Sequence, residues 1–190
     1  MNAFVFGRLI GVALVFITQT VPAAFADQTA PELPALFDQL QDSTDPSLAI
    51  VYEQEIWQRW LTGPTDVAGD NLNAARAAMS LDKLDRADTL LAELTKSTPK
   101  FAEAWNQRAL LRFLRKDYVG ALRDIDETIR LEPRHFGALS GRGQCYLRLN
   151  QPQAALAAFE EALAIHPWLA DVTRHAEILR TYLNDKNQGI

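Results

Sequence analysis

Residues of matched size recur along this chain at a fixed interval of 34 positions. One column is proline and one is alanine: Pro99, Pro133 and Pro167, and Ala87, Ala121 and Ala155. Three more columns share the phase, one small, one large and apolar, and one mixed: Ala75, Ala109 and Gly143; Leu91, Ile125 and Phe159; Leu94, Thr128 and Ala162. Such a period predicts copies of one small unit stacked in a row, because no single unit of this size buries its own apolar face.

Each period divides into two helical segments of about 13 residues. Short polar or proline-containing turns separate the two segments: Asp82–Lys83, Lys116–Asp117 and Gln151–Pro152. The small residue on the first segment lets the second approach closely, and the large apolar residue fills the space toward the next unit. Proline then ends each second helix, since it has no N–H to donate and restricts the residue before it.

This pattern resembles the tetratricopeptide repeat, a helix–turn–helix unit of about 34 residues. Residues 102–135 match its aromatic, small, aromatic, alanine, large apolar and proline positions best: Trp105, Ala109, Tyr118, Ala121, Ile125 and Pro133. The match is weaker in the first unit, where Asn71 and Ala78 replace aromatic residues. The resemblance covers about residues 68–182. It implies an all-α solenoid of three repeats, at residues 67–100, 101–134 and 135–168.

Helices at both ends of the stack are expected to cover its terminal faces. Residues 169–184 carry apolar side chains at helical spacing and read as a capping helix, followed by a tail at 185–190. Residues 27–66 contain a helix start at Asp45–Pro46 and a stop at Gly63–Pro64. We interpret residues 31–64 as two helices that cap the stack or form a degenerate fourth unit. Their two tryptophans, Trp57 and Trp60, are expected to pack rather than to stack on a ligand.

The first 26 residues have the anatomy of a secretory signal peptide. Arg8 precedes a short apolar run at 9–17, and an Ala-x-Ala site at 24–26 leads into polar residues. The run is short for a membrane span, which takes about 20 apolar residues, although an uncleaved anchor is the alternative. We therefore expect an exported protein, periplasmic in a bacterium with two membranes. The mature chain is expected to have no membrane span.

Composition and charge argue against a nucleic-acid-binding function. The chain has 190 residues, 48% of them apolar, and a net charge of −5, so it lacks the basic surface of a nucleic-acid binder.

Cys145 is the only cysteine. We expect it to be a buried small residue, with an intermolecular disulfide as the alternative, because one cysteine cannot form an internal disulfide.

Catalytic, metal and cofactor sites are not indicated by any motif. The chain has no glycine-rich phosphate loop, no G-x-S-x-G sequence and no cysteine with a histidine partner. The three histidines, His135, His166 and His175, lack the spacing of metal ligands on one helix. We therefore expect a protein that is not an enzyme and that carries no metal or cofactor.

An ion pair inside the repeats is implied by the family resemblance. Arg108 and Arg142 stand where the family most often has leucine, and a variant of the repeat pairs such an arginine with an aspartate of the second helix. Asp124 occupies that acidic position in the middle unit, whereas the third unit has Ala158 there. We expect Arg108 to bind Asp124, and Arg142 to reach the same carboxylate from the next unit.

The inner, concave face is where the family touches peptides. Carried onto this chain, that face comprises a half-apolar set with arginine at both ends: Leu72, Arg76, Met79, Asn106, Leu110, Phe113, Leu114, Ser140, Gln144, Leu147 and Arg148. It would suit a protein or peptide segment with apolar anchors and some acidic character. It has no lysine for the family's clamp on C-terminal carboxylates. Two alternatives stay open: the N-terminal helices cover this face, or stacked ends pair two copies into a homo-oligomer.

Overall fold

The computed structural model describes residues 27–187, and this part of the chain forms nine α-helices and no β-strand. In chain order they are α1 Leu33–Asp42, α2 Pro46–Thr62, α3 Asp66–Ser80, α4 Leu84–Ser97, α5 Ala102–Leu114, α6 Tyr118–Leu131, α7 Phe136–Arg148, α8 Pro152–Ile165 and α9 Ala170–Asn187. The all-α class predicted from the sequence is confirmed. The expected signal peptide lies outside the described residues. Within them, every helix is too short or too polar to cross a membrane.

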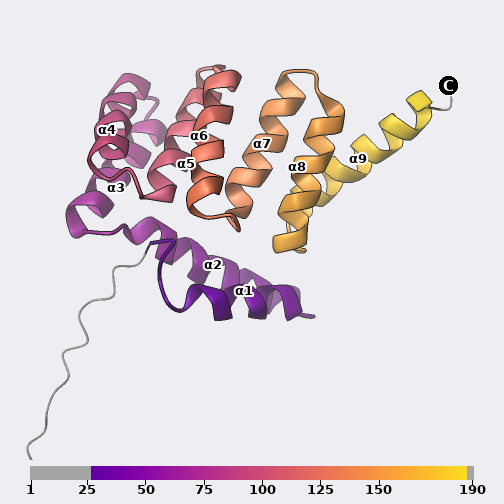
Figure 1. Ribbon diagram of the computed structural model, residues 1–190, viewed down its shortest axis with the longest axis horizontal. Coiled ribbons are helices and arrows are strands. Elements are labelled where there is room, and N and C mark those ends of the chain that lie inside the picture. The colour runs from indigo at the N-terminus through magenta and orange to yellow at the C-terminus, as the bar shows by residue number, and fades with distance from the viewer. Residues whose placement is uncertain (1–26, 188–190) are drawn as a thin grey trace, which may run out of the picture.

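Helices α3 to α8 form three antiparallel pairs that stand side by side in a row (Figure 1). The turn inside each pair contains one residue with positive φ: Asp82 at 55°, Lys116 at 63° and Asn150 at 57°. These residues are again 34 positions apart. The N–H of each of them, and that of the following residue, bonds to a carbonyl in the last turn of the first helix. Each first helix therefore ends in the same left-handed cap.

The columns of small and large residues meet inside each pair, and the same clusters include residues of the next unit, toward which the large residues were predicted to point. Ala75, Ala109 and Gly143 are buried, and so are the large residues opposite them, Leu91, Ile125 and Phe159. Glycine is needed only in the third unit, because a Cβ at Gly143 would lie 2.4 Å from a ring carbon of Phe159. The units thus fill equal space with two alanine–aliphatic pairs and one glycine–phenylalanine pair.

The N-terminal hairpin of α1 and α2 lies along one edge of the stack, crosswise to the repeat helices (Figure 1). Asp45 caps α2 by accepting a hydrogen bond from Ser47 N–H at 2.8 Å, as the Asp45–Pro46 sequence predicts. The hairpin is held by a cluster of buried residues that includes one side chain of the third unit: Leu33, Phe37, Leu40, Ala49, Ile56, Trp60 and Phe136. It leads into α3 through Gly63, whose φ of 83° favours glycine.

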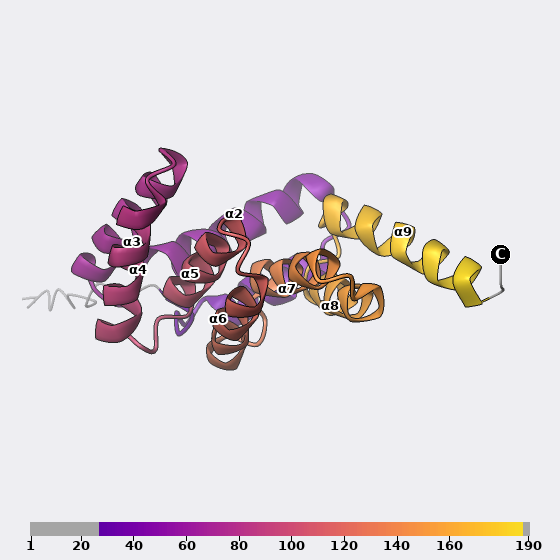
Figure 2. The same ribbon diagram turned by 90° about the horizontal axis from the view of Figure 1, so that it is seen from above.

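Helix α9 follows α8 and projects away from the stack, as both views show (Figures 1 and 2). Its buried residues Val172, Ala176 and Leu179 pack with Leu139 of α7 and Phe159 of α8. The helix continues to Asn187, three residues past the end predicted for the capping helix.

Candidate functional site

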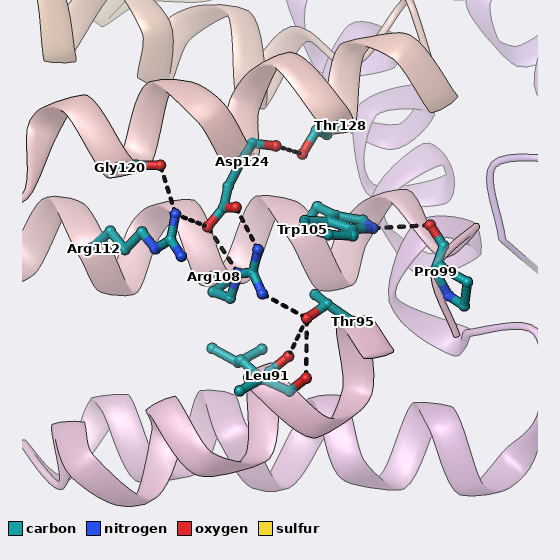
Figure 3. Close-up of polar contacts among 10 residues, drawn as sticks. Leu91, Thr95, Pro99, Trp105, Arg108, Arg112, Gly120, Asp124 and Thr128 are labelled. Carbon is teal, nitrogen blue, oxygen red and sulfur yellow. Dashed lines mark hydrogen bonds and ion pairs between the residues drawn. The ribbon is translucent and has the colours of Figure 1, made fainter. Parts of the chain in front are cut away.

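A buried carboxylate joins the two helices of the middle unit (Figure 3). Asp124 on α6 accepts two hydrogen bonds from Arg108 on α5, at 2.9 Å from Nε and 2.6 Å from Nη2. Arg112 adds an ion pair at 3.1 Å and donates to the carbonyl of Gly120. The remaining Nη of Arg108 donates to Thr95 Oγ1 of the preceding unit at 2.8 Å. The network therefore ties α4, α5 and α6 together around the buried carboxylate of Asp124.

Arg142 does not follow the prediction. Its guanidinium pairs with Glu161 of α8, in its own unit, and the second arginine at Asp124 is Arg112. The reason is local: Arg112 is one turn along the same helix as Arg108, whereas Arg142 has a carboxylate within its own helix pair. The sequence signal was present in Glu161, one turn after Ala158.

The inner residues predicted on α3 divide between the core and the surface. Leu72 is fully buried in the cluster that joins α3, α4 and α5, so its placement in an open groove was wrong. Met79 is half-buried against the same cluster. Arg76 is exposed, and its nearest polar partner is Asn73 on the same helix, at 3.5 Å.

A hollow of about 260 Å³ opens between α5 and α7 on this inner face. Four of the predicted residues line it, together with Trp57 of α2: Asn106, Leu110, Phe113 and Gln144. Gly137 allows Trp57 to approach, because a Cβ there would lie 2.7 Å from the indole. Helix α2 therefore forms one wall of the hollow and does not cover it.

Apolar side chains of α5 stand open to solvent at this hollow and beside it. Leu110, which lines the hollow, is 45% exposed, and Leu114, one turn further along α5, is 49% exposed. Arg148 of α7 is exposed and lies over the ring of Phe113, at 5.8 Å from its centre. Leu147, also predicted here, instead packs half-buried toward α8 and α9. The hollow can thus accept an apolar side chain beside a positive charge.

A second, wider hollow of about 890 Å³ separates α2 from α3. Its walls carry apolar and acidic side chains, including Ile50, Leu61, Asp66 and Asp70. Trp57 lines both hollows, so its side chain lies between them. Sequence reasoning missed this region because α2 lies outside the 34-residue period, and no sequence signal places it against the inner helices.

Two histidines anchor the hairpin to the repeats. His135 is fully buried and its ring stacks on Trp60 of α2, with centroids 4.1 Å apart. Its Nδ1 accepts the N–H of Ala138, so Nε2 carries the proton that faces Glu103 at 2.9 Å. Glu103 also accepts from Asn106 at 3.0 Å, which links this contact to the inner face. No sequence motif marked these residues as partners.

The second histidine contact involves Glu53 of α2. His166 Nε2 approaches its carboxylate at 3.3 Å, and this contact lowers the pKa of Glu53 below its usual 4.5, against partial burial, which raises it. A carboxylate with a lowered pKa in the folded state stabilises that state above about pH 4.5 and loses this contribution as the pH falls further.

We therefore expect Glu53→Gln to lower the free energy of unfolding at pH 7 by less than about 1 kcal/mol, since the group is partly exposed. The difference from wild type should shrink in urea titrations near pH 3. Glu93→Gln is the matched control, because Glu93 is exposed on α4 and has no ion-pair partner among residues 27–187. A difference between wild type and Glu53→Gln that is the same at both pH values would contradict the assignment.

Cys145 is buried, as predicted, and burial raises the pKa of its thiol to about 11. Its thiolate is therefore scarce at neutral pH, which makes it a poor nucleophile and a slow partner for disulfide formation. Among residues 27–187 the side chains of histidine, cysteine, aspartate and glutamate form no group that could hold a metal ion.

Comparison with known proteins gives consistent matches. Two tetratricopeptide repeat family models match residues 72–126 and 137–168. A TPR repeat-containing protein of Rhizobium etli is 33% identical over 146 residues, which are 77% of this chain and 71% of that protein.

Solved structures share the fold at lower identity. The first TPR of Spaghetti (RPAP3), bound to the HSP90 peptide SRMEEVD, superposes with a TM-score of 0.59 at 20% identity, over 62% of this chain and 93% of that chain. The Sgt2 TPR domain from Aspergillus fumigatus gives 0.58 at 17% identity, over 66% and 84%. Both likenesses extend the match with known repeats from sequence to three dimensions.

Proposed function

Because the chain belongs to the tetratricopeptide repeat family, whose members are generally protein–protein interaction modules, we propose that its inner face holds a segment of a partner protein. One observation carries this proposal: exposed Leu110 lines the hollow between α5 and α7, and exposed Leu114 follows it one turn later, although buried apolar residues dominate the rest of α5. Exposed apolar side chains around a concave hollow are typical of a surface that binds another chain.

The charges of the inner face indicate the character of that segment. Within the described part of the chain, neither Arg76 nor Arg148 has a carboxylate within 4.0 Å. These positive groups stand on a chain with a net charge of −5, so they favour an acidic segment locally while the rest of the surface repels it. The Spaghetti domain, a structural neighbour, holds a peptide with three acidic residues. That likeness supports the acidic character of the segment proposed here.

Recognition of a free C-terminal carboxylate is not part of this proposal. The family's clamp uses lysines on the inner face, and the inner-face residues predicted for this chain include no lysine. We propose that binding depends instead on apolar side chains that enter the hollow, with arginine selecting acidic neighbours. An internal segment of a partner would serve as well as a C-terminus.

We also propose that the protein works outside the cytoplasm, in the cell envelope. The leader-like sequence at residues 1–26 supports this location, with its positive charge, short apolar run and Ala-x-Ala site. An interaction module in that compartment would hold or position another envelope protein.

Photo-crosslinking in cells tests both parts. A benzoylphenylalanine at position 110 should give an adduct with another protein, recovered in the periplasmic or membrane fraction. The same group at Asp126, exposed on the outer helix α6, is the control and should give none. Leu110→Asp should weaken the recovered interaction about tenfold, the effect of placing a charge against an apolar anchor. Equal crosslinking from both positions would overturn the groove, and adducts only in the cytosol would overturn the location.

A further inference from the structure

Helix α9 keeps the register of the repeats. The helices α5, α7 and α9 begin at Ala102, Phe136 and Ala170, which are 34 residues apart. Helix α9 is therefore the first helix of a further unit, and no second helix follows it in the described part of the chain. Its residues can be assigned to the inner or the end face from their equivalents in α5 and α7.

The two open faces of α9 differ in character. The face that a second helix would cover carries Glu177 where the earlier units have Ala109 and Gly143. The inner columns carry large apolar residues instead. Ile178 is equivalent to Leu110, and Tyr182 to Leu114; the two are 61% and 51% exposed. Exposed apolar surface on α9 thus lies in the columns of the binding face, whereas the end of the stack is polar.

We propose that the partner-binding face continues across α7 onto α9, with Ile178 and Tyr182 as a second apolar subsite. This inference rests on the proposed function. The face then has three zones in order: Leu110 and Leu114 on α5, Arg148 on α7, and Ile178 and Tyr182 on α9. Its ligand is a protein segment with an apolar residue toward each end and an acidic residue between them.

Arg148, in the middle zone, determines that the central residue of the ligand is acidic. Arg148 has no carboxylate within 4.0 Å in the range 27–187, and its guanidinium lies over the ring of Phe113. Packed helices lie about 8–10 Å apart, so two helix spacings amount to at least about 16 Å, or about five residues of extended chain. Helix α9 diverges from the stack, which lengthens this span (Figure 2). The ligand must therefore be longer than one that fills the hollow alone.

A second copy of this chain is the competing occupant. Stacking of the two C-terminal ends would bury Glu177 and the exposed Thr181 on the polar face of α9, which disfavours that arrangement. Pairing through the inner columns would bring two copies of Arg148 into one apolar interface. Charge complementarity therefore favours an acidic segment from another protein.

The test is selection from a phage-displayed library of random peptides of about 16 residues, long enough to span the three zones. The whole protein and its Ile178→Ser/Tyr182→Ser variant are panned in parallel. Wild type should enrich peptides with an acidic residue between two apolar ones, and a synthetic copy should bind the variant about tenfold more weakly. Both changes are on exposed side chains, so unaltered circular dichroism and melting temperature would show that folding is intact.

Three results would count against the inference in different ways. Equal binding of the enriched peptide to both proteins, together with weaker binding to Leu110→Ser, removes α9 from the site and leaves the proposed function standing. Enrichment of no peptide, or binding that Leu110→Ser leaves unchanged, overturns the proposed function itself. Sedimentation that shows a dimer for wild type and a monomer for the α9 variant overturns the inference in favour of self-association.

Discussion

Asp124→Ala is expected to lower the free energy of unfolding by about 3–5 kcal/mol, because it leaves the partly buried guanidinium of Arg108 without its counter-charge. Asp124 is buried, and its carboxylate oxygens lie within 3.1 Å of guanidinium nitrogens of both Arg108 and Arg112. Arg108 also supports Thr95 of the preceding unit, so the loss should reach across the boundary between units. Urea unfolding at pH 7 measures the effect.

Two further variants separate pairing from loss of volume. Asp124→Asn keeps the size of the side chain and should still cost most of the effect, since the charge is what the arginines require. Arg108→Ala combined with Asp124→Ala should cost less than the sum of the two single changes, because the second change no longer leaves an isolated charge. Additive losses would show that Arg108 and Asp124 act independently.

Gly143→Ala is expected to lower the free energy of unfolding by about 1–3 kcal/mol. This is the reverse of the usual gain of about 0.5–1 kcal/mol when alanine replaces glycine inside a helix. The added Cβ would lie 2.4 Å from the ring of Phe159, which is fully buried in the cluster formed by α7, α8 and α9. Thermal unfolding followed by circular dichroism would measure the shift.

A compensating change offers the matched control. Phe159→Ile alone should destabilise the protein by leaving a cavity, but combined with Gly143→Ala it recreates the pair that the middle unit already has, Ala109 with Ile125. The double variant should therefore be more stable than either single variant. If Gly143→Ala is as stable as wild type, the close contact with Phe159 does not limit this position.

The repeat stack could be predicted because its signals are local and periodic. The 34-residue columns fix which side chains meet, and the helix start at Asp45–Pro46 and the turn at Gly63 fix the hairpin elements. Even the left-handed residues at 82, 116 and 150 obey the period. The predicted turns include Asp82 and Lys116, whereas the third predicted turn begins one residue after Asn150. The same 34-residue interval relates Ile178 to Leu110 and Tyr182 to Leu114. Extending the interval past the last full repeat would have predicted both residues on the inner face.

The hairpin and the fine structure of the site could not be predicted in this way. The position of α2 depends on Trp60 stacking against His135, a contact between residues 75 positions apart that no period relates. Asp124 pairs with Arg112 and not with the predicted Arg142. This choice depends on how far each side chain reaches, which the 34-residue columns do not specify. Leu72 is buried because α3 packs on α4 and α5. A position that faces the inner surface in the second unit therefore lies in the core in the first.

The crosswise hairpin changes how this stack can come apart. In an ordinary solenoid each unit touches only its neighbours, so an end can fray while the rest stays folded. Here α2 leads directly into the first unit, yet the hairpin is fastened to the third through Phe136 and through a hydrogen bond from Gln41 to the carbonyl of Ala164. The hairpin therefore connects the first unit to the third and holds the distance between them. This contact sets the curvature of the inner face before a ligand binds.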